Sequence, residues 1–238
     1  MDLKETDILG EELSAHWYYR SKARATLLML KNHAPAKILD VGAGSGFFAR
    51  YLLAHTGASE AWCVDTGYMD DWSTIDLGKP IHFQRSISTS SADLLLLMDV
   101  LEHVDDDMGL LREYSSKIPR NGNVLISVPA FQSLWSEHDE FLDHKRRYTL
   151  RGLERLVERS GLSVLCGAYF FGFVLPAAAA SRLSTRFRPM PRNQRRSQLS
   201  RHSRLVNEAL AHICDLELKL MRLNRLGGLT AFCLASIP

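Results

Sequence analysis

A glycine loop that directly follows an apolar run is the sequence feature that most constrains the fold. Residues 38–46 read Ile-Leu-Asp-Val-Gly-Ala-Gly-Ser-Gly, and a second apolar run, 61–64, ends at Asp65. An apolar strand, a glycine turn and an acidic residue about twenty positions later are the parts of a βαβ unit that binds a nucleoside. The sequence therefore predicts an α/β fold with a nucleoside site at this turn.

The register of the glycines narrows the choice of ligand. A dinucleotide fingerprint needs glycine at position 47, which is Phe47 here, and a P-loop would end in Gly-Lys-Ser/Thr, which is absent. The pattern Asp-x-Gly-x-Gly-x-Gly begins at Asp40 and resembles motif I of the class I S-adenosylmethionine-dependent methyltransferases. The alternative at this point is a glycine turn in an α/β protein that binds another ligand.

The resemblance implies that S-adenosylmethionine is the cofactor and S-adenosylhomocysteine the product. Asp65 can accept hydrogen bonds from both ribose hydroxyls, and the glycine loop is expected to pack against the methionine part, with Asp40 adding hydrogen bonds. The residues expected to contact the cofactor are Tyr19, Arg20, Asp40, Gly42, Ala43, Gly44, Gly46, Asp65, Thr66, Ser86, Met98, Asp99, Val100 and His103.

Strands and helices are expected to alternate along the chain. Strands are expected at 38–41, 61–64, 81–83, 93–98, 123–128, 162–169 and 229–234, and helices at 11–32, 47–56, 105–117 and 202–223. Asp105 is expected to cap the third of these helices. The alternation predicts a doubly wound, mostly parallel, Rossmann-like sheet of seven strands, with ligands at the carboxyl ends of the strands.

The fourth strand runs into a segment that reads Met-Asp-Val-Leu-Glu-His-Val from Met98 to Val104. It resembles the Leu-Glu-His block of small-molecule methyltransferases, including those of the ubiquinone-biosynthesis type. The Asn/Asp-Pro-Pro-aromatic run of nucleic-acid amino-methyltransferases is absent. Asp99 and His103 are expected to face the cofactor, and His103 either acts in catalysis or packs to fix the loop.

A second block follows the fifth strand. Residues 129–148 contain Pro-Ala-Phe, Leu-Trp-Ser-x-x-Asp and His-x-Arg-Arg-Tyr, and they resemble a bacterial subgroup of the same family (methyltransferase types 11, 12 or 23). Substrate contacts are expected from Trp135, His138, Asp139, Arg146, Arg147 and Tyr148, and catalytic roles from His103, His138, His144 and Tyr148.

Alternatives remain for this block. The arginines could instead pair with Asp139 or Asp143 to fasten the loop, and His138, Asp139 and His144 could bind zinc, although no metal is predicted. Methyl transfer from a sulfonium mostly requires alignment and exclusion of water. A hydroxyl acceptor would need a base such as His138 or His144, whereas an amine or carboxylate would not.

The chain departs from the family pattern between its last two strands. Residues 1–170 and 228–238 are expected to form the methyltransferase domain, and 171–227 an inserted segment that is apolar, then arginine-rich, then an amphipathic helix. Apolar residues at 205, 206, 210, 213, 216, 220 and 223 should form the buried stripe of that helix. Another departure follows the third strand, where residues 84–88 read Gln-Arg-Ser-Ile-Ser and lack the acidic residue expected near the adenine. Either Ser86 or the backbone of Ile87 is expected to contact the adenine instead.

Charge is distributed unevenly. Residues 159–207 contain nine arginines, no lysine and no acidic residue. We expect this segment either to cover the pocket or, through 170–204, to rest on a membrane surface. The uncharged run that precedes most of the arginines is not expected to span the membrane, because Gly172 and Pro176 interrupt it. The expected partners are a small-molecule or lipid-like acceptor and a second copy of the chain, and DNA is not expected. An RNA-modifying enzyme and a non-catalytic cofactor-binding module are the alternatives.

The first residues and the cysteines of the chain indicate where in the cell the protein is expected. The first residues are acidic and lack an apolar signal core, and the four cysteines form no Cys-x-x-Cys pair. We therefore expect a cytoplasmic protein, with contact at the inner face of the membrane as the alternative.

Overall fold

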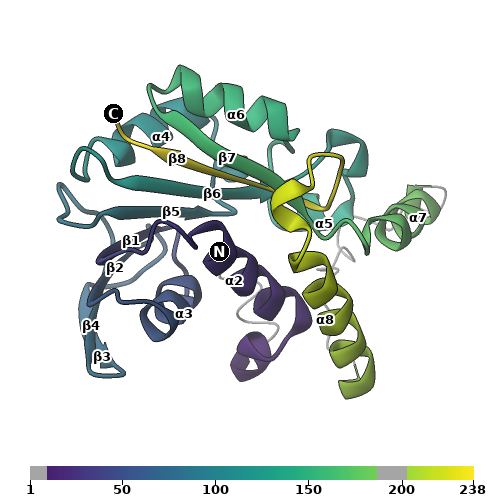
Figure 1. Ribbon diagram of the computed structural model, residues 1–238, viewed down its shortest axis with the longest axis horizontal. Helices are drawn as coiled ribbons and strands as arrows, with labels where there is room; N and C mark the ends of the chain where they lie inside the picture. Colours follow the sequence, from purple (N-terminus) through teal and green to yellow (C-terminus); the bar gives the residue numbers. More distant parts are fainter. Residues whose placement is uncertain (1–9, 187–202) are drawn as a thin grey trace.

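An eight-stranded sheet forms the centre of the computed structural model, which describes residues 10–186 and 203–238 (Figure 1). The strand order is β3-β4-β2-β1-β5-β6-β8-β7. The strands are β1 (Lys37–Val41), β2 (Glu60–Val64), β3 (Trp72–Asp76), β4 (Lys79–Gln84), β5 (Leu94–Met98), β6 (Asn123–Pro129), β7 (Ser163–Phe170) and β8 (Thr230–Ser236). The five strands from β4 to β6 in that order are parallel, which confirms the predicted doubly wound α/β sheet.

The prediction of seven strands is wrong, because β3 adds an eighth at the edge. It pairs with β4 as an antiparallel hairpin whose two turn residues, Leu77 and Gly78, both have positive φ (52° and 75°). That is the backbone of a tight hairpin turn. Most of β3 is exposed or half-buried. The sequence of β3 therefore lacks the continuous apolar run that identified the buried parallel strands.

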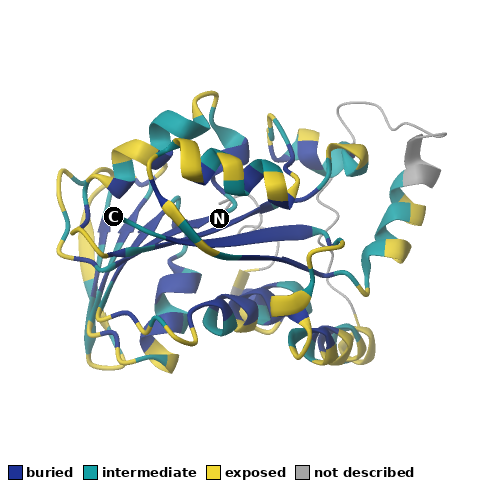
Figure 2. Cartoon of the chain, turned by 45° about the horizontal axis from the view of Figure 1, so that its top comes forward, coloured by how far each residue is buried: buried dark blue, intermediate teal, exposed yellow. Residues whose placement is uncertain are grey.

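Helices cover both faces of the sheet (Figure 2). They are α2 (Trp17–Met29), α3 (Phe47–His55), α4 (Asp107–Ser115), α5 (Glu137–Phe141), α6 (Leu150–Arg159), α7 (Leu175–Arg186) and α8 (Arg204–Leu218), with short 3-10 turns η1 (Gly10–Ser14), η2 (Leu101–His103), η3 (Gln132–Leu134) and η5 (Met221–Leu223). One hydrophobic core lies under α2 and α3, and a second lies under α4 and α6. Every residue of β5 is buried, since β5 lies between β1 and β6 with helices on both sides.

Two helix starts differ from the prediction. The expected helix over 11–32 is divided into η1 and α2, and the His16 side chain accepts a hydrogen bond from the Tyr18 amide at the start of α2. The helix expected from Asp105 begins later, because Asp106 is the residue that caps it: Asp106 Oδ1 accepts the Gly109 amide at 2.8 Å. Side-chain capping of a free amide fixes such a start.

The segment between β7 and β8 contributes α7 and α8. β7 and β8 pair directly as antiparallel neighbours, as predicted, and α8 lies along α2 (Figure 1). The predicted buried stripe of α8 is wrong: Leu205, Leu216, Leu220 and Leu223 are exposed, whereas Ala211 and Cys214 are buried. Ion pairs from Arg20 to Glu208 and from Arg24 to Asp215 orient the helix this way.

The uncharged run before the arginines does not form a long apolar helix. α7 begins at Leu175, and Pro176 occupies its first turn, where a missing amide proton is tolerated. Within the described ranges, no helix is both long and apolar enough to cross a membrane. Residues 187–202, which hold much of the predicted basic surface, lie outside the described residues.

Candidate active site

A cavity of about 370 Å³ opens at the carboxyl ends of β1, β2 and β5. This is the edge at which parallel sheets bind ligands. The lining residues are Val41, Gly42, Val64, Asp65, Thr66, Gly67, Asp99, Val100, His103, Val104, Leu110 and Tyr114. The structure therefore brings together six residues predicted to contact the cofactor: Gly42, Asp65, Thr66, Asp99, Val100 and His103.

Gly42 lets its loop pack closely against Val100 in one wall of this cavity. Its φ is +66°, and a Cβ atom at this position would lie 2.7 Å from Cγ2 of Val100. Gly46 has a different role: it starts α3 in a left-handed conformation, and its Cβ would lie 2.9 Å from the ring of Phe83 in the core. Of these two glycines, only Gly42 lines the cavity.

Asp65 connects the two loops that border the cavity. Its Oδ2 accepts the Gly44 amide at 3.0 Å, and its Oδ1 accepts the Gly67 amide at 2.8 Å. Each carboxylate oxygen has a further lone pair. A fixed carboxylate that lines the cavity and keeps acceptor capacity is suited to hold the hydroxyls of a ribose.

We expect Gly42→Ala to weaken cofactor binding at least tenfold, because the added methyl group would lie 2.7 Å from Val100 and push apart two residues that line the cavity. The matched control is Gly78→Ala, since Gly78 has a similar φ of +75° but a methyl group added there would meet no atom within 4 Å. Both variants carry the same backbone strain of about 1–2 kcal/mol. Isothermal titration and thermal unfolding separate the two effects, and equal losses of affinity in both variants would refute the steric role of Gly42.

Asp40 lies behind the loop rather than in the cavity. It is fully buried, and its Oδ2 has no hydrogen-bond partner. Burial raises the pKa of Asp40 from 3.8 to about 7, although a hydrogen bond from the Ala49 backbone opposes the shift. The predicted hydrogen bonds from Asp40 to the cofactor therefore stay a prediction.

The raised pKa of Asp40 predicts that Asp40→Asn increases the stability of the fold in a pH-dependent way. A carboxyl with a raised folded-state pKa destabilises the fold once it ionises, so the penalty is complete above pH 7 and absent below about pH 4. We expect the cofactor-free variant to be more stable than the wild type at pH 8, by at most about 4 kcal/mol. Thermal unfolding at several pH values measures this, and a gain that does not shrink at low pH would contradict it.

An ion pair between a buried lysine and a half-buried aspartate borders the cavity. The ammonium of Lys22, in α2, pairs with the carboxylate of Asp99, whose backbone has a φ of +55°. The Asp99 amide donates to the Ser127 carbonyl at 2.9 Å, and Ser127 Oγ donates to Asp99 Oδ1 at 3.3 Å. Burial alone would lower the pKa of Lys22 and raise that of Asp99. The attraction between the two charges outweighs burial, so the pKa of Lys22 is raised and that of Asp99 is lowered.

The aromatic end of α2 has less contact with the cavity than expected. Tyr19 is buried in the core against Phe47, with ring centroids 5.6 Å apart, and Arg20 pairs with Glu208 of α8. Their contacts with the cofactor stay predictions. Lys22, one turn further along, was missed by sequence reasoning, although it shares the buried face of α2 with Tyr19, Ala23 and Thr26.

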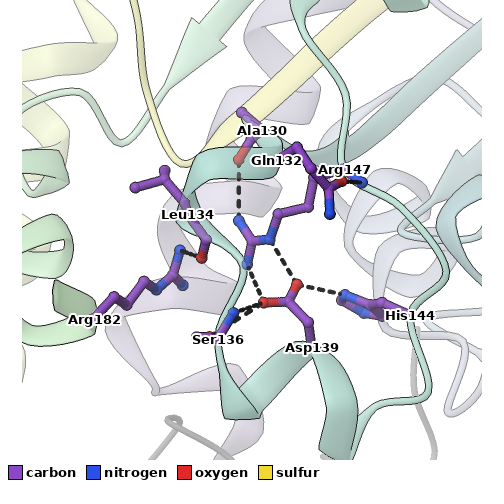
Figure 3. A network of polar contacts seen from close by, with 8 residues as sticks. All are labelled: Ala130, Gln132, Leu134, Ser136, Asp139, His144, Arg147 and Arg182. Atoms are coloured by element: carbon purple, nitrogen blue, oxygen red, sulfur yellow. Dashed lines mark hydrogen bonds and ion pairs between the residues drawn. The ribbon is translucent and has the colours of Figure 1, made fainter. Parts of the chain in front are cut away.

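Asp139 is the centre of a polar network after β6 (Figure 3). Arg147 donates to Asp139 Oδ1 from Nε at 2.6 Å and to Oδ2 from Nη2 at 3.0 Å. The Ser136 amide donates to Oδ2 at 2.8 Å, and His144 Nδ1 lies 3.0 Å from Oδ1. Burial would raise the pKa of Asp139, but His144 and Arg147 lower it overall, so the carboxylate is ionised. These contacts match the alternative in which Arg147 fastens the loop.

Arg146 and Tyr148 attach the same loop to α4 and η2. Arg146 Nη1 donates to Asp107 Oδ2 at 3.1 Å, and the Tyr148 hydroxyl lies 2.8 Å from that same oxygen. Burial and Asp107 raise the pKa of Tyr148, so it is a poor proton acceptor. Burial lowers the pKa of His138 to about 3, which makes His138 a weak base. The predicted catalytic roles of Tyr148 and His138 stay predictions.

The remaining predicted residues lie around the cavity rather than in it. Ala43 and Met98 are buried, Trp135 is half-buried after η3, and Gly44 contributes through its bond to Asp65. Ser86 lines an adjoining hollow that shares Thr66 with the cavity. Sequence reasoning missed Leu110 and Tyr114, which reach the cavity from α4.

Comparison with known proteins decides the family. Residues 14–166 match the family Methyltransf_23, described as a methyltransferase domain. The chain belongs to this methyltransferase family. Its cofactor is S-adenosylmethionine, and the cavity lined by Gly42 and the carboxylate of Asp65 fits that group. No curated protein matches the sequence significantly.

Solved structures with this methyltransferase fold are distant in sequence. A chain from the complex of the Haloferax volcanii Trm112 activator with a putative methyltransferase is 14% identical, with a TM-score of 0.56, covering 95% of this chain and 92% of that one. A methyltransferase from Archaeoglobus fulgidus is 17% identical, with a TM-score of 0.50 and coverage of 91% and 94%. Haemonchus contortus phosphoethanolamine N-methyltransferase 2 is 12% identical, with a TM-score of 0.53, covering 100% of this chain and 61% of that one.

The chain is shorter than several such methyltransferases. It covers 57% of a putative O-methyltransferase from Nostoc punctiforme and 56% of PhzM, a protein of pyocyanin biosynthesis. These likenesses concern the fold.

Proposed function

We propose that this methyltransferase transfers the methyl group of S-adenosylmethionine to an oxygen or nitrogen atom of a small-molecule acceptor. The observation that carries the proposal is the cavity at the carboxyl ends of β1, β2 and β5, which Gly42 and Asp65 line together with His103 of the Leu-Glu-His segment. His103 lines the cavity, and its ring lies 4.7 Å from that of His144 on the loop after α5. The part of the cavity that would hold the methyl donor therefore lies next to a pair of histidines that could contact the acceptor.

Small-molecule acceptors agree with the structural relatives. The Haemonchus enzyme was solved with phosphomonomethylethanolamine, and PhzM belongs to pyocyanin biosynthesis. Both have TM-scores above 0.5 to this chain. Neither likeness identifies the acceptor here, since one fold serves many substrates.

The chain's own residues contribute alignment and electrostatics to the reaction. The cofactor supplies an activated methyl group. The Lys22–Asp99 pair places a charged group at the cavity wall, and the Arg147–Asp139 pair holds the loop that carries His144. Fixed charged groups that need no rearrangement stabilise a reaction in which charge moves. His144 and His103 remain the side chains placed to accept a proton from a hydroxyl acceptor.

An amphipathic acceptor at a membrane surface is part of the proposal. The end of α8 and the η5 turn that follows expose Leu216, Leu220 and Leu223 together with Lys219 and Arg222, a combination that suits an anionic lipid surface. Homodimer formation through the same face would use the same leucines. We favour the lipid surface because basic residues flank the apolar ones.

Transfer of label from methyl-labelled S-adenosylmethionine tests the proposal. The protein is incubated with cell extract that is separated afterwards into water-soluble, lipid and RNA fractions. We expect label in the water-soluble or the lipid fraction, and none when Asp65→Ala replaces the wild type. Label confined to RNA would show the RNA-modifying alternative, and binding of the cofactor without transfer to any fraction would support a non-catalytic module.

A further inference from the structure

Three potential metal ligands gather beside the cofactor cavity. Glu102, His103 and His144 each offer one ligand atom, and these atoms all lie within 4.8 Å of one another. Glu102 and His103 come from η2, and His144 comes from the loop after α5. The Lys145 amide donates to the Glu102 carbonyl at 2.8 Å, which fixes the two segments against each other. Among the residues that the structure describes, this group alone has metal-ligand spacing.

The side chain of Glu102 lacks a partner. Glu102 is fully buried, and neither of its carboxylate oxygens has a hydrogen-bond partner. The ammonium of Lys22 is already paired with Asp99. A buried carboxylate without a partner is costly, and such groups normally pair with a cation or bind a metal. The geometry therefore leaves room for a positive charge at Glu102.

The orientation of His144 is that of a metal ligand. Its Nδ1 lies 3.0 Å from Asp139 Oδ1, and the ionised carboxylate accepts the proton on that nitrogen. Its Nε2 is then the nitrogen with a lone pair. A carboxylate behind a histidine fixes the tautomer and ring direction of metal-binding histidines. Asp139 is itself held by Arg147 and Ser136, so this supporting shell is complete in the protein.

We propose that Glu102, His103 and His144 bind one divalent transition-metal ion, of the Zn²⁺ class, on the acceptor side of the cavity. Two imidazoles and one carboxylate suit such ions better than Mg²⁺ or Ca²⁺. Ligand atoms around a tetrahedral zinc ion lie about 3.4 Å apart, so the three side chains close by about 1 Å on binding. Asp139 supports His144 and is not a ligand, unlike in the His138, Asp139 and His144 set considered from the sequence.

This site specifies the acceptor, and that step rests on the proposed function. Three protein ligands leave a position open for the acceptor, as in catalytic zinc sites. A hydroxyl bound there loses its proton to water more readily, so His103 and His144 act as ligands and are not needed as bases. The acceptor oxygen then forms the new bond to the methyl carbon, and the electron pair of the broken carbon–sulfur bond remains on sulfur. The acceptor class is thus a hydroxylated molecule, and the product is a methyl ether.

Metal titration of the full-length protein tests the site. After treatment with a chelator, the protein is titrated with Zn²⁺ by calorimetry and with Co²⁺ by its visible absorption. We expect one equivalent of metal to bind, and His144→Ala, His103→Ala and Glu102→Gln to weaken binding at least tenfold. His212→Ala, at an exposed position on α8, is the matched control and should bind as the wild type does. Thermal unfolding of each variant identifies loss of the fold, and Glu102→Gln preserves side-chain size.

The possible results test the metal site and the proposed function independently of each other. Absence of metal binding, or equal binding by the wild type and Glu102→Gln, would overturn the metal site. S-adenosylmethionine is titrated separately: if it binds and transfers its methyl group while no metal binds, the methyltransferase proposal stands and the metal site is refuted. If metal binds and no methyl transfer occurs, the metal site stands and the proposed function fails.

Discussion

Asp65→Ala should weaken the binding of S-adenosylmethionine by about two orders of magnitude. Asp65 lines the cavity, and both of its oxygens are held in place by the Gly44 and Gly67 amides. Each hydrogen bond from a ribose hydroxyl to a carboxylate contributes about 1.5–3 kcal/mol, and about 1.4 kcal/mol is a tenfold change in affinity. Removal of two such bonds accounts for the expected loss, which isothermal titration measures directly.

Two further variants make this result specific. Asp65→Asn keeps one acceptor oxygen, so we expect an affinity between those of the wild type and Asp65→Ala. Glu113→Ala removes a carboxylate from the exposed side of α4 with the same change in net charge, and it should bind the cofactor normally. If Asp65→Ala binds the cofactor as tightly as Glu113→Ala does, the ribose does not lie at Asp65.

Arg147→Met should cause the largest loss of stability. It leaves the ionised carboxylate of Asp139 buried, with Ser136 and His144 as its remaining partners. Breaking a buried ion pair by removing one partner costs about 3–5 kcal/mol. For a chain of this size that lowers the midpoint of thermal unfolding by on the order of 10 °C, as scanning calorimetry would show.

The neighbouring arginine provides the control for that measurement. Arg146 pairs with Asp107 at 3.1 Å, but its side chain is 33% exposed, against 2% for Arg147. Solvent screens the exposed pair, so Arg146→Met should lose about 1 kcal/mol or less. Equal losses for the two variants would show that the Asp139 network does not hold the loop together.

The sequence predicted the parts of the fold that depend on continuous apolar runs. Four predicted strands have ends within one or two residues of those of β1, β2, β5 and β6: 38–41, 61–64, 93–98 and 123–128. They could be recognised because buried parallel strands are apolar on both faces. The edge strand β3 escaped prediction, since an exposed strand needs no apolar pattern. The orientation of α8 was wrong because its ion pairs with α2 place its small residues, not its leucines, against the core.

The site could be predicted where it depends on local chain geometry. Gly42 and Asp65 belong to one βαβ turn, and their spacing alone brought them together. The Lys22–Asp99 pair joins residues 77 positions apart, so only the packing of α2 on the sheet reveals it. Glu102 was visible within the Leu-Glu-His segment, but the burial of its side chain without a partner is a property of the folded chain.

A crystal structure of the protein with S-adenosylhomocysteine tests the cofactor site most directly. We expect the ribose hydroxyls within hydrogen-bonding distance of the Asp65 carboxylate, the adenosine against Val100, Leu110 and Tyr114, and the sulfur on the side of His103. Density for the ligand at any other edge of the sheet, or a ribose that does not contact Asp65, would contradict the assignment of this cavity to the methyl donor.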